Sequence, residues 1–131
     1  MKGAITYLNF DGNCRDAMTF YGKCLQADPN FTPFSAGPPE LPPVVKTAPD
    51  RILHAELTSG PVVLMASDTL PGMSFQAGNN FSICIDCETQ PEMERLFAAL
   101  SETARSQCHC TTHSGVAASV CSRINSVSVG C

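Results

Sequence analysis

The hydrophobic pattern near the start of the chain changes from strand-like to helix-like. The segment from Ala4 to Phe10 has the β-branched and aromatic content of a strand. Residues 11–13, Asp-Gly-Asn, then turn the chain and offer a helix cap. From Cys14 to Leu25, apolar residues recur at the three- and four-residue spacing of an amphipathic helix. The pattern therefore predicts a strand followed by a helix over residues 4–25.

More strand-like segments follow this first pair of elements. Phe31 to Phe34 is a candidate short strand, whereas the prolines of residues 35–50 are incompatible with a helix or a central strand and predict a loop or lid. Arg51 to Leu57 and Pro61 to Ser67 read as two strands joined by a short glycine-containing turn, as in a hairpin.

A second strand and helix come after an irregular stretch. Asn80 to Cys87 predicts a strand, and Pro91 to Leu100 a helix whose start carries a capping box of Thr89 with Glu92. The order β-α-β-β-β followed by β-α indicates a duplicated module, whose second copy needs three more strands. The predicted fold class is α+β.

The chain changes character near Glu102. All 12 acidic residues lie in residues 1–102, whereas residues 103–131 contain no Asp or Glu, four of the 8 cysteines and many Ser, Thr and Gly residues. We expect this tail to be aberrant and poorly ordered, so that the second module is incomplete.

The patterned part of the chain resembles the vicinal oxygen chelate superfamily, which includes glyoxalases, bleomycin resistance proteins and extradiol dioxygenases. It is most similar to the PhnB-like branch, often labelled demethylubiquinone methyltransferase-like. The matching segments are Tyr7–Cys14 with Ala17 and Phe20-Tyr21, Arg51–Leu57, Leu64–Asp68 and Glu94–Leu100.

The resemblance implies paired βαβββ modules that form a curved sheet around a ligand cleft, often completed by a partner in a homodimer. Residues 1–102 are then the glyoxalase-like domain, with module one at 1–78 and the start of module two at 79–102. For this chain the homodimer is in doubt, because the second module lacks its final strands.

A shifted reading frame accounts for the tail. With suitable codons, residues 107–115 and the residues from 120 onward read in another frame as MPLHDAFW and MLTDQFGVSWM, strings that look like the final strands of PhnB-like proteins. Our hypothesis is that the residues from about Thr103 onward are a frameshift product.

Charge and composition exclude several classes of partner. The net charge is −4 and the basic residues are dispersed, so nothing favours a nucleic-acid partner. No apolar run approaches the roughly 20 residues that a membrane span needs. The chain enters a strand pattern directly from Met1 without a signal segment, and we expect a cytoplasmic protein with reduced, mostly structural thiols.

His54 and Glu56 are the leading candidate site residues. They lie two apart on one predicted strand and therefore share a face, while Leu53, Ala55 and Leu57 take the other. A histidine and a carboxylate on a cleft could bind a divalent metal or act as a base. The alternative is a histidine hydrogen-bonded within the sheet beside a solvated glutamate.

The first strand adds Tyr7 and Asn9 as ligand-cleft candidates. The resemblance places metal ligands on the first and last strands of each module, and those positions offer no His/Glu set in this chain. A divalent metal cofactor is therefore only one interpretation, and the catalytic residues are not assigned.

Two cysteine clusters are more simply read as structural or accidental. Cys84 and Cys87 match Cys-x-x-Cys, but residues three apart on a strand face opposite sides. Cys108-His109-Cys110 with His113 and Cys121 resembles a metal cluster, yet its Cys-x-Cys spacing is tighter than that of structural zinc sites, and the frameshift explains these residues.

Taken together, the sequence predicts a small-molecule-binding protein of the glyoxalase/bleomycin resistance type. The alternatives are a divalent-metal-dependent lyase or dioxygenase-like enzyme, and a non-functional product of a frameshifted gene. The methyltransferase label finds no chemical support, because the strand-to-helix turn has one glycine, Gly12, where a Rossmann-like cofactor site needs a glycine-rich turn.

Overall fold

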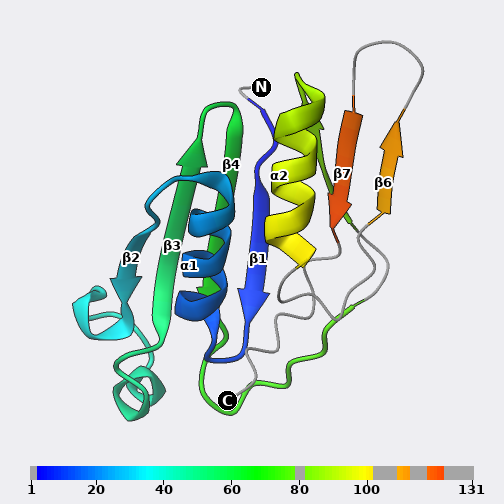
Figure 1. Ribbon diagram of the computed structural model, residues 1–131. Coiled ribbons are helices and arrows are strands. Elements are labelled where there is room, and N and C mark those ends of the chain that lie inside the picture. The colour runs from blue at the N-terminus through cyan, green and yellow to red at the C-terminus, as the bar shows by residue number, and fades with distance from the viewer. Residues whose placement is uncertain (1–2, 79–81, 102–108, 113–117, 123–131) are drawn as a thin grey trace. The chain divides into compact units, whose positions relative to one another are not determined.

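The structure is a computed structural model that describes residues 3–78, 82–101, 109–112 and 118–122, the last two ranges by their backbone (Figure 1). The chain divides into two compact units, Met1–Phe75 and Gln76–Cys131. The end of module one at residue 78 stays a prediction from the sequence.

The first unit is one complete βαβββ module. Its strands form a sheet of order β1-β4-β3-β2, in which β1 is parallel to β4 and the other pairs are antiparallel (Figure 1). The predicted α+β class and module order are confirmed. The elements are β1 (Thr6–Phe10), α1 (Cys14–Leu25), β2 (Asn30–Pro33), the 3-10 helices η1 (Phe34–Ala36) and η2 (Pro43–Thr47), β3 (Ile52–Ser59) and β4 (Val62–Asp68).

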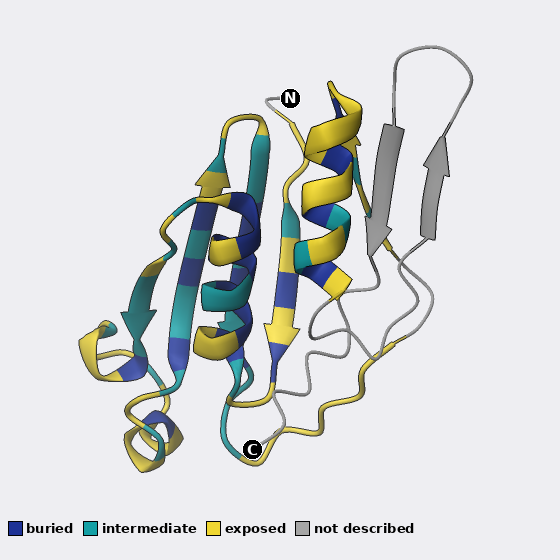
Figure 2. Ribbon diagram, viewed as in Figure 1, coloured by how far each residue is buried: buried dark blue, intermediate teal, exposed yellow. Residues whose placement is uncertain are grey.

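The core of this unit lies between α1 and one face of the sheet, which α1 covers in Figure 1. The helix contributes Ala17 and Met18, both 0% exposed, because its apolar residues recur on a single face. Burial alternates along the strands (Figure 2), as expected for a sheet with one covered face. The strand residues in this core include Leu8, Phe10, Ala55, Leu57, Leu64 and Ala66.

Helix α1 ends in a left-handed cap. Gln26 has φ 55°, and the N–H of Ala27 donates to the carbonyl of Gly22 at 2.9 Å. The carbonyl oxygen of Ala27 lies 2.6 Å from the position that a Cβ on Gly22 would occupy. The chain can therefore reverse here only because residue 22 has no side chain.

The start of β3 departs from simple alternation. The register shifts opposite Thr32 and Pro33, so that Pro33 pairs with Ile52 and Thr32 with His54. Leu53 is the extra residue of this irregularity. As a result Ile52 is buried at 1% exposure and Leu53 is only half-buried, so the alternation expected to place Leu53 on the face of Ala55 and Leu57 does not extend to the start of β3.

The second unit contains β5 (Ile83–Cys87), α2 (Gln90–Ser101), β6 (His109–Thr112) and β7 (Ala118–Ser122), with strand order β5-β7-β6 and antiparallel pairing. At the start of α2, the hydroxyl of Thr89 accepts from the N–H of Glu92 at 3.4 Å, as the capping box predicts. The carboxylate of Glu92 accepts from the N–H of Glu88, not from that of Thr89.

Strands β6 and β7 lie within residues 103–131, where the sequence pattern predicts no regular structure. Threonine and valine in these segments suit a β backbone. The domain boundary at residue 103 and the reading-frame hypothesis stay predictions. None of the helices among the described residues is long and apolar enough to cross a membrane.

Candidate functional site

The sheet of the first unit has a second face, away from α1, which we call the open face. Strand register places Tyr7 opposite Met65, Met65 opposite Glu56 and Glu56 opposite Asn30. Residues directly opposite each other lie on the same face of a sheet. These residues therefore form one row that crosses all four strands.

The next positions along the strands bring the remaining candidates to the same face. Asn9 pairs with Ser67, and Thr32 pairs with His54. Tyr7 and Asn9 are exposed, whereas His54 and Glu56 are half-buried. The sequence-based candidates Tyr7, Asn9, His54 and Glu56 thus share one face, and their role as ligand-binding residues stays a prediction.

Tyr7 and His54 meet across the intervening strand β4. The phenol Oη lies 3.5 Å from His54 Nδ1, and the two ring centroids are 6.1 Å apart with the planes tilted by 35°. The tyrosine hydroxyl can donate or accept, and the imidazole role depends on which nitrogen carries the proton. The pair therefore presents an aromatic surface together with groups that can hydrogen-bond a ligand.

Glu56 is the carboxylate of the open face. Its Oε1 accepts a hydrogen bond from the hydroxyl of Thr58 at 3.4 Å. This contact is long and leaves most of the acceptor capacity of the carboxylate for another partner.

The superfamily includes enzymes that bind a divalent metal ion, but the described residues of this chain do not form a site that fits one. His54 and Glu56 supply two donors, whereas catalytic zinc sites use three protein ligands. Within the described residues, no group of three or more His, Cys, Asp or Glu side chains could hold a metal ion. We therefore derive no chemistry through a metal at this site.

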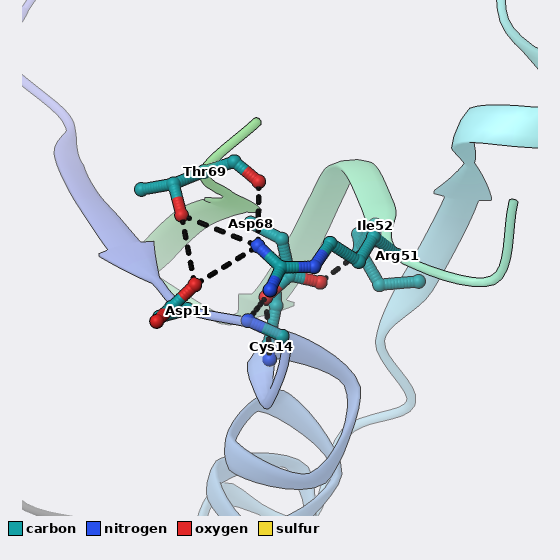
Figure 3. A network of polar contacts seen from close by, with 7 residues as sticks. Asp11, Cys14, Arg51, Ile52, Asp68 and Thr69 are labelled. Atoms are coloured by element: carbon teal, nitrogen blue, oxygen red, sulfur yellow. Dashed lines mark hydrogen bonds and ion pairs between the residues drawn. The ribbon is translucent and has the colours of Figure 1, made fainter. Parts of the chain in front are cut away.

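Sequence reasoning missed Asp68, a buried carboxylate with several hydrogen bonds at the end of β4. Asp68 is 6% exposed, and its Oδ1 accepts from the N–H groups of Gly12 at 2.8 Å and Cys14 at 3.0 Å (Figure 3). Its Oδ2 accepts from the N–H of Ile52 at 2.8 Å. An aspartate that ends an apolar strand was the available signal, but its partners lie far away in sequence.

Arg51 belongs to the same end of the sheet. Its Nη1 lies 2.9 Å from Asp11 Oδ1 and donates to the carbonyl of Thr69 at 2.9 Å (Figure 3). The hydroxyl of Thr69 donates to Asp11 Oδ1 at 3.2 Å. This guanidinium is therefore neutralised at the strand ends.

The thiol of Cys14 lies beside this network. Burial, and then the charge of Asp68, raise the pKa of Cys14 to about 12, against a smaller lowering by Arg15. The thiol therefore stays protonated near neutral pH and is a poor nucleophile. Burial also raises the pKa of Tyr21.

Cys14, Cys24 and Cys87 are buried, whereas Cys84 is exposed. Cys84 and Cys87 thus differ in exposure, as opposite faces of a strand require, and the expectation of buried structural thiols fails for Cys84. In the second cysteine cluster, Cys108 and His113 lie outside the described residues.

Comparisons with known proteins agree with this architecture. A family model described as 3-demethylubiquinone-9 3-methyltransferase matches residues 2–116. The crystal structure of protein PA1353 from Pseudomonas aeruginosa is similar to this chain, with 32% sequence identity and a TM-score of 0.71. The match covers 86% of this chain and 82% of the PA1353 chain. No curated protein matches.

A second solved structure is a putative 3-demethylubiquinone-9 3-methyltransferase, PhnB protein, from Bacillus cereus, with a TM-score of 0.60 over 86% of this chain and 84% of that chain. Its identity of 20% supports the fold alone. The family match spans most of the sequence, and the module order agrees with it. The chain therefore belongs to the 3-demethylubiquinone-9 3-methyltransferase family, the PhnB-like branch of the glyoxalase-type vicinal oxygen chelate superfamily.

Proposed function

We propose that this chain binds a small organic molecule on the open face of the β1-β4-β3-β2 sheet, as a binding protein of the glyoxalase/bleomycin resistance type. The observation that carries the proposal is the contact between Tyr7 and His54 at 3.5 Å, from strands that are not neighbours. Ligand sites typically combine an apolar or aromatic surface with a few converging polar groups. The open face has both in the row through Tyr7, Met65 and Glu56.

The two faces of the sheet differ in the way that such a role requires. The face under α1 is filled by apolar side chains such as Leu57 and Leu64, at 1% and 4% exposure. The open face has the exposed ring of Tyr7, at 47% exposure, among hydrogen-bonding side chains. Exposed aromatic surface on one side of a sheet supports a binding role more readily than a packing role within this unit.

Methyl transfer, which the family description names, is not our proposal for this chain. In a Rossmann-type cofactor site, the N–H groups at the turn before the helix are free to bind the cofactor. Here the N–H groups of Gly12 and Cys14 at that turn are bonded to Asp68. The carboxylate of Asp68 therefore uses the backbone donors that a cofactor would need at this turn.

Backbone-amide NMR with a panel of small aromatic fragments tests the proposal. We expect at least one fragment to shift the amide resonances of Tyr7, His54, Glu56 and Met65 in a saturable way, without shifting those on α1. Replacing Tyr7 with Ala is expected to weaken the binding of that fragment about tenfold, since the aromatic contact and its hydrogen bond are both lost.

The control is Tyr21→Phe, which changes the other tyrosine of the chain on the covered side of the sheet. Its fragment affinity is expected to match that of the unchanged protein. A chelator added to the titration should also leave the affinity unchanged. If no fragment shifts the open-face amides, or if the shifts centre on α1, the proposal is wrong.

A further inference from the structure

We propose that the ligand of the open face carries a positive charge, as an ammonium or amidinium group, that pairs with Glu56 while its apolar part lies over Met65 and Tyr7. This inference rests on the proposed function and specifies the chemical class of its ligand. It comes from the distribution of charged side chains over the first unit.

The lysines and arginines described in residues 3–78 lie outside the strand positions that form the open face, on which His54 lies. Lys23 lies in the last turn of α1, and Lys46 in η2. The guanidinium of Arg15 lies 4.8 Å from the ring centroid of Phe31, which is opposite the core residue Ala55. Arg51 is paired with Asp11 at the strand ends. Among the described strand positions of the open face, Glu56 is therefore the carboxylate, and none of these positions holds a lysine or arginine.

Glu56 forms no ion pair with a lysine or arginine described in residues 3–78, where Arg51 pairs with Asp11. Its described contact is with the hydroxyl of Thr58. The residue is half-buried, which reduces the screening of its charge by water. A ligand cation placed at this carboxylate would supply the missing counter-charge.

The neighbours of Glu56 suit the rest of a cationic aromatic molecule. Met65 lies directly between Glu56 and Tyr7 in the cross-strand row. Adjacent strands are about 4.8 Å apart, so the backbones at Glu56 and Tyr7 are separated by about 10 Å. A ring joined to an amine by two carbons can therefore lie over the Met65 thioether with its cation at Glu56 and its apolar edge toward the ring of Tyr7.

The same arrangement selects against anions. A carboxylate or phosphate on this face would approach Glu56 without meeting a lysine or arginine from the described residues of the first unit. Like charges at a partly desolvated site oppose binding, and this repulsion contributes to specificity.

Three probes with the same ring and different charge test the inference: phenethylamine, phenethyl alcohol and phenylacetate. Each is titrated into the full chain, and its Kd is obtained from the amide shifts of residues on the open face. We expect phenethylamine to bind about tenfold more tightly than the alcohol, as a charge-assisted hydrogen bond allows, and phenylacetate to bind most weakly.

Glu56→Gln keeps the size of the side chain and removes its charge. In this variant the affinity for phenethylamine is expected to fall about tenfold, to that of the alcohol, while the affinity for the alcohol is unchanged. Glu40→Gln, on an exposed loop, is the matched control and should leave the preference for the amine unchanged. The amide spectrum of each variant reports that it is folded.

The outcomes separate this inference from the proposed function. If the three probes bind the open face with equal affinity, or if Glu56→Gln retains the amine preference, the cationic ligand class is wrong and the binding face stands. If none of the three probes shifts the open-face amides, the cationic ligand class is wrong, and the proposed function fails as well when no fragment of the panel shifts them.

Discussion

The Oδ2 atom of Asp68 accepts a hydrogen bond from the backbone N–H of Ile52 at 2.8 Å, which ties the end of β4 to the start of β3. The other carboxylate oxygen binds the N–H groups of Gly12 and Cys14, in the turn that leads from β1 into α1. One buried side chain thus joins three segments of the first unit. The irregular start of β3 can form because its backbone donor has this acceptor.

We predict that Asp68→Asn destabilises the protein. The amide keeps one acceptor oxygen but turns an NH₂ group toward backbone donors, so at least one buried N–H loses its partner. The expected loss in the free energy of unfolding is about 3 kcal/mol, the cost of leaving buried groups unpaired around a charged hydrogen-bond acceptor. Urea denaturation monitored by circular dichroism measures it.

Asp11→Asn is the matched control at the same end of the sheet. Its carboxylate pairs with Arg51 while about half exposed, so the change should cost less than about 1 kcal/mol. Equal losses for the two variants would contradict the role assigned to Asp68.

We predict that stability falls on the alkaline side because of Cys14. Its pKa is raised from an ordinary 9.0 to about 12 in the folded chain. Between these values the unfolded chain has lost the proton and the folded chain has kept it, so the free energy of unfolding decreases as pH rises. The expected contribution is about 1.4 kcal/mol per pH unit, beginning near the unfolded pKa.

From pH 9 to pH 10 the raised pKa of Cys14 already lowers stability, whereas the raised pKa of Tyr21 acts mainly above its ordinary value of 10.0. Chemical denaturation of the unchanged protein and of Cys14→Ala is compared across this window. The free energy of unfolding of Cys14→Ala should fall less steeply with pH than that of the unchanged protein, whatever the stability of the variant at pH 7. Parallel slopes would show that the Cys14 thiol ionises as readily in the folded chain as in the unfolded one.

We predict opposite effects at two positions of the α1 terminus. Alanine normally stabilises a helix interior by about 1 kcal/mol relative to glycine. At Gly22 the new Cβ would meet the carbonyl oxygen of Ala27 at 2.6 Å, so Gly22→Ala should instead lower the thermal midpoint. Gln26→Gly should raise it, since a left-handed φ of 55° suits glycine better than glutamine. A higher midpoint for Gly22→Ala would show that the reversal of the chain is not as tight as described.

Local pattern was sufficient for most of the first unit. The helix Cys14–Leu25 was predicted with its exact bounds, because three- and four-residue spacing specifies a helix on its own. Alternation likewise placed His54 and Glu56 on one face of β3. It did not show that Tyr7 reaches His54 across β4, since that contact joins residues 47 positions apart.

The features that escaped prediction depend on distant partners. Leu53 departs from the alternation of Ala55 and Leu57 because of a register shift opposite Pro33, on another strand. Asp68 is bonded to residues up to 56 positions away, and no local rule pairs them. The proline-rich loop contains two short 3-10 helices, η1 and η2, whose single turns leave little periodicity in a sequence.

We predict that the DNA encoding residues 103–131 contains a second reading frame that specifies the end of a PhnB-like protein. The loss of all acidic residues after Glu102, with four cysteines in 29 residues, marks a change of composition within one predicted module. Sequencing the coding region tests this directly, and the alternative frame should encode strings close to MPLHDAFW and MLTDQFGVSWM.

A frame-repaired protein provides the physical counterpart of that test. If its restored residues supply the strands that the second module pattern demands, it should bury more apolar surface and unfold at a higher temperature than the present chain. Differential scanning calorimetry of the two proteins side by side measures the difference. An alternative frame interrupted by stop codons, together with equal thermal midpoints, would show that residues 103–131 are the intended end of the second unit.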